Sequence, residues 1–424
     1  MTFLTRLYLA ASMGLFAVLF VPQGAASVQV GSTPPFVLAW TCLYAATILL
    51  FVRQRLRLKR VDLLFLLAGL FVVSSAFWSS NPLRSGIYGA LLLMNALFVS
   101  QLIRKFDADT FVRLVVDTIT LLCVIGLTLH IAGAELVSYY DPHGRTTIVG
   151  TDPIRGLFNH KITAGLYTAI GFALATATLS GLRKWFTCGV LLVFNVLTGS
   201  ATGHFALVAG WSLSCVVRAS LARRFSPTVF STLLLLAILM IGPIMWLALP
   251  TLLEFLGRDP TLTGRTLLWA WGIDAGMQRP WLGWGYVGYI GSAEAIMYAQ
   301  RLQRFVNYEV PHFHNSYVQA FVELGALGVV AYIFVLFMAM KRTYEAALKT
   351  RSRGFTGLAI IIPLIACAGM FMNLFIKYNS FVTMILLYSW LIYRPRSRAA
   401  EGITAVRRVS SPRLAIQRPV LERL

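Results

Sequence analysis

The chain has 424 residues, of which 58% are apolar and 12% are charged, and its formal net charge is +21. Such a composition excludes an ordinary soluble domain. A spanning helix needs about 20 mostly apolar residues, and the chain offers about a dozen such segments. A barrel would show short alternating segments instead, so we expect an all-α polytopic membrane protein.

Twelve apolar segments are predicted to span the membrane within a transmembrane domain formed by residues 1–393. The first segment has the length of a signal peptide, but no small-residue cleavage site leads from it into a soluble domain, so we interpret it as a helix. Residues 394–424 are a basic tail without predicted order. The expected spans are 5–22, 36–52, 62–79, 84–103, 111–132, 162–181, 185–198, 203–218, 228–250, 316–340, 355–376 and 379–393.

Basic residues gather in alternate connections between these spans. Residues 53–60 hold five, 218–224 three and 341–353 five, and the tail holds eight arginines against two glutamates. Since positive charge accumulates in cytoplasmic loops, these connections and the N-terminus are predicted to be cytoplasmic. Their expected partner is the anionic lipid surface rather than nucleic acid.

This assignment of alternate connections to the two sides of the membrane, called the threading below, places the loops 133–161 and 251–315 in the periplasm. The first has three acidic and three basic residues, and the second has five of each. Because neither loop has a net charge, topology does not explain its arginines. The larger loop is expected to contain a helix at 266–278, ended by Pro280, and a helical segment at 293–308. Together they would form an active-site cap on the outer face.

Four tryptophans lie in or near the first helix of this cap. Indole rings are favoured at the interface between lipid and water, so we expect these side chains at the membrane surface. They are Trp269, Trp271, Trp281 and Trp284.

His314 ends the larger loop directly before the predicted helix 316–340. An imidazole titrates near neutrality and takes a proton from a hydroxyl, so His314 is a candidate general base. Asn315 and His312 flank it as supporting residues. The structural alternative is a histidine that braces the start of the helix. Glu323, two turns into the helix, is costly in apolar surroundings, and we expect it to pair with an arginine or a histidine.

The arginines of the two outer loops suit a diphosphate, because guanidinium groups bind phosphate oxygens in a bidentate manner. Arg258 and Arg265 lie in the larger loop, whereas Arg155, His160 and Lys161 end the smaller one. The alternative for each basic residue is an ion pair with a nearby carboxylate.

Patterns for metal or nucleotide chemistry are not convincing. Asp107 and Asp109 form a D-x-D pair, which binds metal in many glycosyltransferases, but the threading makes it cytoplasmic, and Asp107 is expected to cap a helix. The sequence has no P-loop and no zinc spacing, and its five cysteines lie inside apolar segments. We therefore expect neither a metal ion nor a cofactor.

Several motifs resemble the O-antigen ligase/polymerase superfamily of bacterial membrane proteins. They are GRDPTLTGR at 257–265, PWLGWG at 280–285, and His314-Asn315 followed after nine residues by Gly325 and Gly328. The segment RGLFNHK at 155–161 is similar to another element of that family. The motifs lie mainly in the second half of the chain, and the first five helices match only in hydropathy. Ligases, polymerases and protein glycosylases share them.

The resemblance implies a metal-independent glycosyltransferase that uses a polyprenyl-diphosphate-linked glycan. In this resemblance the family's histidine corresponds to His314 and its loop arginine to Arg265. The match at Arg155 is less firm, and Arg258 has no assigned role. We therefore predict an O-antigen ligase of the bacterial inner membrane. It would transfer a glycan from undecaprenyl diphosphate to a sugar hydroxyl of lipid A–core, with His314 as base and Arg265, Arg155 and Lys161 holding the diphosphate.

Two alternatives remain open. A polymerase of O-antigen or exopolysaccharide would use the same donor, and the number of outer basic residues does not decide between the two enzymes. A transporter or flippase of lipid-linked sugars would place polar residues in mid-span. Asp117 and Glu323 are the clearest mid-span charges, so the pattern favours an enzyme.

Overall fold

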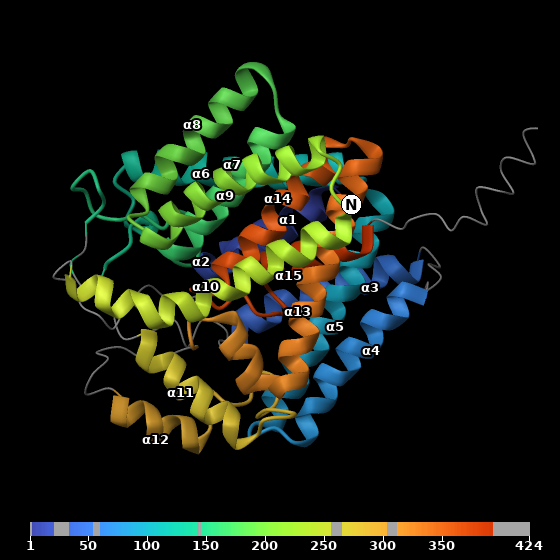
Figure 1. Ribbon diagram of the computed structural model, residues 1–424, viewed down its shortest axis with the longest axis vertical. Helices are drawn as coiled ribbons and strands as arrows, with labels where there is room; N and C mark the ends of the chain where they lie inside the picture. The colour runs from blue at the N-terminus through green and yellow to red at the C-terminus, as the bar shows by residue number, and fades with distance from the viewer. Residues whose placement is uncertain are drawn as a thin grey trace, which may run out of the picture. The chain divides into compact units, whose positions relative to one another are not determined.

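The computed structural model describes residues 2–20, 34–53, 60–141, 144, 146–255, 265–302 and 312–392 (Figure 1). Contacts divide the chain into residues 1–392 and 393–424, and the second unit lies outside the described residues. The described secondary structure is helical apart from one isolated bridge, between Ser138 and Ile154.

The α-helices follow the predicted order of elements. They are α1 Thr2–Met13, α2 Leu15–Phe20, α3 Pro34–Arg53, α4 Arg60–Ser74, α5 Pro82–Lys105, α6 Ala108–Ile131, α7 Lys161–Thr178, α8 Gly181–Leu197, α9 Ala201–Ala222, α10 Pro227–Phe255, α11 Arg265–Gln278, α12 Ala293–Leu302, α13 Ser316–Thr350, α14 Arg353–Ala368 and α15 Phe381–Ile392. Two short 3-10 helices, η1 Ser75–Phe77 and η2 Glu135–Val137, complete the series.

Each predicted span overlaps helical structure, but the first is broken. Gly14, with φ +132°, separates α1 from α2, and a Cβ there would lie 2.3 Å from the amide nitrogen of Asn159. A continuous helix with a side chain at this position would collide with the 158–159 backbone. The prediction of one helix over 5–22 is therefore wrong in detail.

Four described helices, α5, α6, α9 and α13, are long and apolar enough to cross a membrane. Helices of this length and hydropathy are those of a helical membrane protein. The number of twelve spans and the orientation in the membrane remain predictions.

Polar caps fix where several helices begin. Asp107 Oδ1 accepts a hydrogen bond of 2.7 Å from the Thr110 amide at the start of α6, which confirms the predicted N-cap. Ser200 and Ser352 cap α9 and α14 in the same way. These caps satisfy amides that have no partner within the helix.

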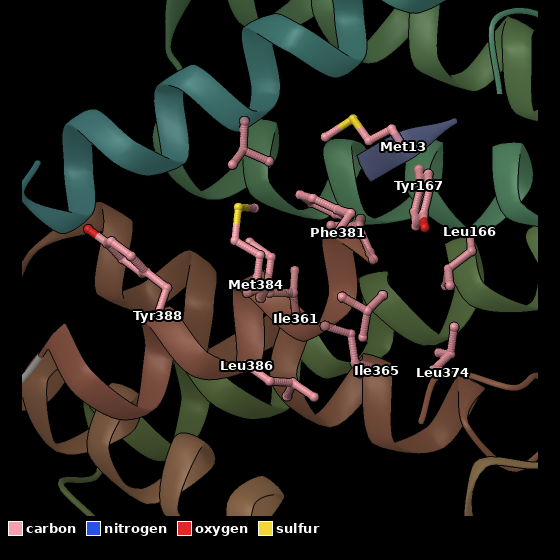
Figure 2. Close-up of a cluster of buried hydrophobic side chains, with 14 of the residues drawn as sticks. Met13, Leu166, Tyr167, Ile361, Ile365, Leu374, Phe381, Met384, Leu386 and Tyr388 are labelled. Carbon is pink, nitrogen blue, oxygen red and sulfur yellow. The ribbon is translucent and has the colours of Figure 1, made fainter. Parts of the chain in front are cut away.

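Helix α14 lies at the centre of the apolar core and packs against α6, α7, α9, α10 and α13. Figure 2 shows its Ile361 and Ile365 among side chains of α7 and α15. Tyr167 of α7 meets Phe381 of α15 edge-on, with ring centroids 5.2 Å apart. The second half of the chain therefore packs into one core with α7 and anchors the loops at the ends of these helices.

Connections that the threading places on one side of the membrane are joined by hydrogen bonds. The carboxylate of Asp109, in the first turn of α6, accepts from Ser352 Oγ at 2.7 Å and from the Gly354 amide at 2.8 Å. On the other predicted side, the amide of Ser80, before α5, donates to the Trp284 carbonyl at 3.2 Å. Each of these two contacts joins segments that the threading assigns to the same side.

Helices α11 and α12 and the segment 279–292 form a cap with its own apolar core beside the start of α13 (Figure 1). Trp271 Nε1 donates to Tyr289 Oη at 2.8 Å, and Trp284 Nε1 donates to the Ala275 carbonyl at 2.8 Å. The buried members of this cluster are Leu268, Trp271, Ala275, Trp284, Tyr289, Ala295, Phe313 and Val322.

The cap corrects the expectation for its tryptophans. Trp269, Trp271 and Trp284 are at most 4% exposed, whereas Trp281 is 72% exposed. Trp271 and Trp284 are core residues of the cap, because a small helical unit needs large apolar side chains to form a core, and Trp269 is buried as well. Only Trp281 presents a surface that suits lipid or its interface.

Candidate active site

A break in α13 joins two of the sequence motifs. Gly325 has φ +65° and ψ −160° within the helix, a conformation open essentially to glycine. Segment 280–285 fills the break, since the Ala326 amide donates to the Pro280 carbonyl at 2.7 Å and the Trp284 amide to the Val322 carbonyl at 2.9 Å. The predicted helix over 316–340 is therefore present but broken at Gly325, and hydrogen bonds fix the cap to the helix that carries the site.

His314 is held between this cap and the first turn of α13. Phe313 is fully buried in the cap core, and its amide donates to Gln319 Oε1 at 3.2 Å. Asn315 caps α13 by accepting from the Tyr317 and Val318 amides at 2.9 and 3.2 Å. Anchors on both sides hold His314 at φ +51°, a left-handed conformation that is uncommon for a residue with a Cβ.

His312 and His314 face each other with ring centroids 4.2 Å apart. The His314 amide donates to Nδ1 of His312 at 3.2 Å, so the neutral form of His312 carries its proton on Nε2. Burial, then His314, Lys377, His160 and Arg265, lower the pKa of His312 well below its ordinary value. His312 is therefore a neutral donor beside His314.

Residues from both outer loops act electrostatically on His314. Burial, and then Coulomb interactions with Arg265, His160 and Lys377, lower the pKa of His314 to about 3. Arg265 is the first residue of α11, whereas His160 precedes α7. Both predicted loops and the connection between α14 and α15 thus contribute residues to one site around His314, with Arg265 and Lys377 as its cations.

His160 and Lys161 have partners within the smaller loop. His160 Nδ1 accepts from the Ile162 amide at 3.1 Å, and its Nε2 lies 2.8 Å from Tyr139 Oη. Burial, followed by the charge of Lys161, lowers the pKa of His160 to about 4. The Lys161 ammonium forms a buried ion pair with Asp141. Lys161 is thus paired with a carboxylate, which is the alternative to phosphate binding that the sequence left open.

Arg155 is half-buried and tied to the backbone. Its Nε and Nη2 both donate to the Leu136 carbonyl at 3.3 Å. Burial lowers the pKa of Arg155, but a guanidinium remains charged at any physiological pH. Arg155 therefore supplies a fixed positive charge to the site, although two of its nitrogen donors already bond to the backbone.

Glu323 lies close to the break in α13 and is 5% exposed. Its Oε1 accepts from Gln319 Nε2 at 2.6 Å, and its Oε2 is buried without a hydrogen bond of normal geometry. Among the described residues Glu323 forms no ion pair with an arginine or a histidine, and the glutamine one turn earlier supplies its hydrogen bond instead. Arg258, also predicted for the site, lies outside the described residues.

Sequence reasoning missed Lys377. It lies between α14 and α15, and its charge acts on both His312 and His314. One signal was available, since Lys377 is the sole charged residue in 354–393. Tyr139, the partner of His160, had no such signal.

The arrangement offers a neutral imidazole surrounded by fixed cations, which suits proton transfer next to an anionic leaving group. Among the described residues, no three of His, Cys, Asp and Glu are grouped as metal ligands. Metal independence stays a prediction from the sequence.

Comparison with known proteins identifies relatives of this chain. Residues 186–333 match the family described as O-antigen ligase. The chain is also 28% identical, over 289 residues, to the exopolysaccharide production protein ExoQ of Rhizobium meliloti (strain 1021). The aligned region covers 64% of this chain and 62% of that protein. The matched part is therefore less than two thirds of this relative. The family match includes Arg265, His312 and His314 but neither the smaller loop nor Lys377.

Proposed function

We propose that this chain, whose residues 186–333 match the family described as O-antigen ligase, transfers a glycan from a polyprenyl diphosphate to a sugar hydroxyl. The observation that carries the proposal is the convergence of cations from separate loops on His314. A binding protein would need the cations but not an imidazole held in a strained backbone conformation at their centre.

In the proposed reaction, the hydroxyl oxygen of the acceptor attacks the anomeric carbon of the donor sugar. The bond between that carbon and the phosphate oxygen breaks, and the polyprenyl diphosphate leaves with the electron pair. His314 accepts the hydroxyl proton, while Arg265 and Arg155 stabilise the charge that develops on the phosphate oxygens. Such a leaving group needs a positive field, which these guanidinium groups supply without a metal ion.

Burial, and after it the neighbouring positive charges, disfavour protonation of His314 and lower its pKa to about 3. A base of that pKa is weak. A bound diphosphate brings negative charge next to the same cations, and a neighbouring negative charge raises the pKa of a histidine. Donor binding would therefore activate His314 as a base. Without the donor, His314 would be too weak a base to take a proton from water.

The acceptor distinguishes two versions of this function. We propose lipid A–core as the acceptor and an O-antigen ligase of the inner membrane, with the site facing the periplasm and undecaprenyl diphosphate as the donor carrier. The match to an exopolysaccharide production protein favours a second candidate, a polymerase that extends an exopolysaccharide or O-antigen glycan.

Deletion of the gene tests the choice of acceptor. A ligase predicts lipopolysaccharide without its long glycan, together with long chains that accumulate on the polyprenyl carrier. A polymerase of O-antigen predicts lipopolysaccharide capped by a single repeat unit, and a polymerase of exopolysaccharide predicts loss of the secreted polymer with intact lipopolysaccharide. Either polymerase result would contradict the ligase. Unchanged surface and secreted polysaccharides would contradict both.

A further inference from the structure

Lys377 is the basic residue of the site that neither a motif nor an ion pair explains. It lies in the connection between α14 and α15 and belongs to none of the ion pairs found among the described residues. Glu323 is the carboxylate that acts on it electrostatically. A half-buried ammonium without an ion pair is costly, so its presence at this position needs a physical reason.

The backbone on both sides of Lys377 is fixed relative to His314. Before it, Ser316 Oγ donates to the Met372 carbonyl at 2.9 Å and accepts from the Leu374 amide at 2.7 Å. Ser316 is only two residues from His314. The same connection is therefore joined directly to the helix start that positions the candidate base.

Further contacts hold the residues next to Lys377. Tyr286 Oη, from the cap segment, donates to the Ile376 carbonyl at 3.0 Å, and Tyr44 Oη donates to the Tyr378 carbonyl. The Lys377 amide itself donates to Thr383 Oγ1 at 2.9 Å. The ammonium is thus carried by a short, immobilised stretch of backbone, as a binding residue requires.

Arg84, the other cation near Glu323, has a different role. Its Nη1 donates to the Ile290 carbonyl at 3.0 Å and thereby ties α5 to the cap. Lys377 makes no such side-chain contact among the described residues. Its charge instead acts on His312 and His314, where the proposed leaving group would lie.

We propose that Lys377 binds a phosphate oxygen of a lipid substrate at this site. The inference rests on the proposed function. The phosphate belongs either to the diphosphate of the donor or to a phosphate of the acceptor lipid, and the chemistry is the same, since an ammonium binds phosphate as a point charge.

The experiment compares wild type with K377M and K377R, purified and reconstituted in nanodiscs. K349M is the matched control, because Lys349 lies at the far end of α13, paired with Glu345 at 2.7 Å. Binding of undecaprenyl diphosphate and the Michaelis constants for donor and acceptor are measured separately. Loss of a charge-assisted contact predicts a weakening of about ten- to hundred-fold in K377M, with partial recovery in K377R and none of this effect in K349M.

The arms identify the source of the phosphate. A raised Kd for undecaprenyl diphosphate with a raised donor KM assigns Lys377 to the donor, and a raised acceptor KM alone assigns it to the acceptor. Unchanged values in K377M would overturn the proposal. If wild type binds undecaprenyl diphosphate but transfers no glycan, the proposed function fails, while the Kd of K377M still tests Lys377.

A double variant separates binding from neutralisation of Glu323. If Lys377 only compensates that carboxylate, E323Q should restore the K377M protein to wild-type melting temperature and wild-type KM values. The proposal predicts that E323Q/K377M recovers stability but keeps the weak binding. Recovery of both would overturn it.

Discussion

His314 owes its position to its neighbours rather than to its own contacts. Phe313 is buried in the cap, and Asn315 caps α13, so the residue between them has little conformational choice. The sequence motif predicted the importance of His314 and Asn315. It did not predict that Asn315 acts through the helix start or that His314 has a positive φ, because such backbone strain depends on packing at both sides.

The contacts of the charged site residues were likewise only partly predictable from the sequence. Arg265, Arg155 and His160 were recognised from loops that the threading places together. In the structure Arg265 and His160 act on His314, and Arg155 acts on His160. Lys161 was assigned to phosphate, but its ion pair with Asp141, twenty residues earlier, depends on how the loop folds. Lys377 was missed because no motif contains it.

The buried histidines predict a loss of stability in acid. The pKa values of His160 and His314 are lowered to about 4 and about 3, and that of His312 is well below its ordinary value of 6.5. Between about pH 6.5 and pH 4 the unfolded state therefore binds more protons than the folded state. Stability is present above the unfolded pKa and falls as the pH is lowered through this window.

Melting curves of the reconstituted protein from pH 7.5 to 4.5 measure this effect. His314→Gln, which cannot be protonated, should flatten the pH dependence of Tm relative to wild type. His130→Gln, outside the site, is the control. An equally steep decline in His314→Gln and wild type would contradict the burial of a neutral imidazole at this position.

At the scale of elements, the contact between α13 and segment 280–285 connects two motifs that are far apart in sequence. The sequence predicted both elements, and most helix boundaries agree within a few residues. It did not predict the break at Gly325, because apolar periodicity continues across it. A glycine within a helix pattern shows only that a side chain is absent, and the reason here is the backbone of Trp281, 2.3 Å from where a Cβ would lie.

Gly325→Ala should therefore expel the inserted segment and cost about 1–3 kcal/mol of stability or more. Glycan transfer should fall with it, since the cap and His314 are positioned by this contact. Gly189→Ala is the control, as no atom lies within 4 Å of a Cβ there. Thermal melting and transfer are the measurements. A Gly325→Ala protein that melts and works like Gly189→Ala would show that the break is dispensable.

At the scale of the whole molecule, the threading predicts that residues 133–161 and 251–315 face the periplasm. Cysteines at Val149 and Ala293, both exposed, should react with an impermeant thiol reagent in outer-permeabilised cells. A cysteine at Thr350, on the predicted cytoplasmic side, should react only after lysis. The native cysteines must first be replaced, since Cys42 and Cys215 are exposed. Protection of Val149Cys or Ala293Cys in intact cells would overturn the orientation.

Glycan transfer by purified protein tests the central claim most directly. Wild type, His314→Ala and Arg265→Ala are incubated with polyprenyl-diphosphate-linked glycan and either lipid A–core or a glycan acceptor, in the presence of EDTA. We predict transfer by wild type, a loss of about 10²–10⁴-fold in His314→Ala with donor binding retained, and loss of both donor binding and transfer in Arg265→Ala. Transfer by His314→Ala at the wild-type rate, or wild-type transfer that appears only when magnesium or manganese is restored, would contradict that claim.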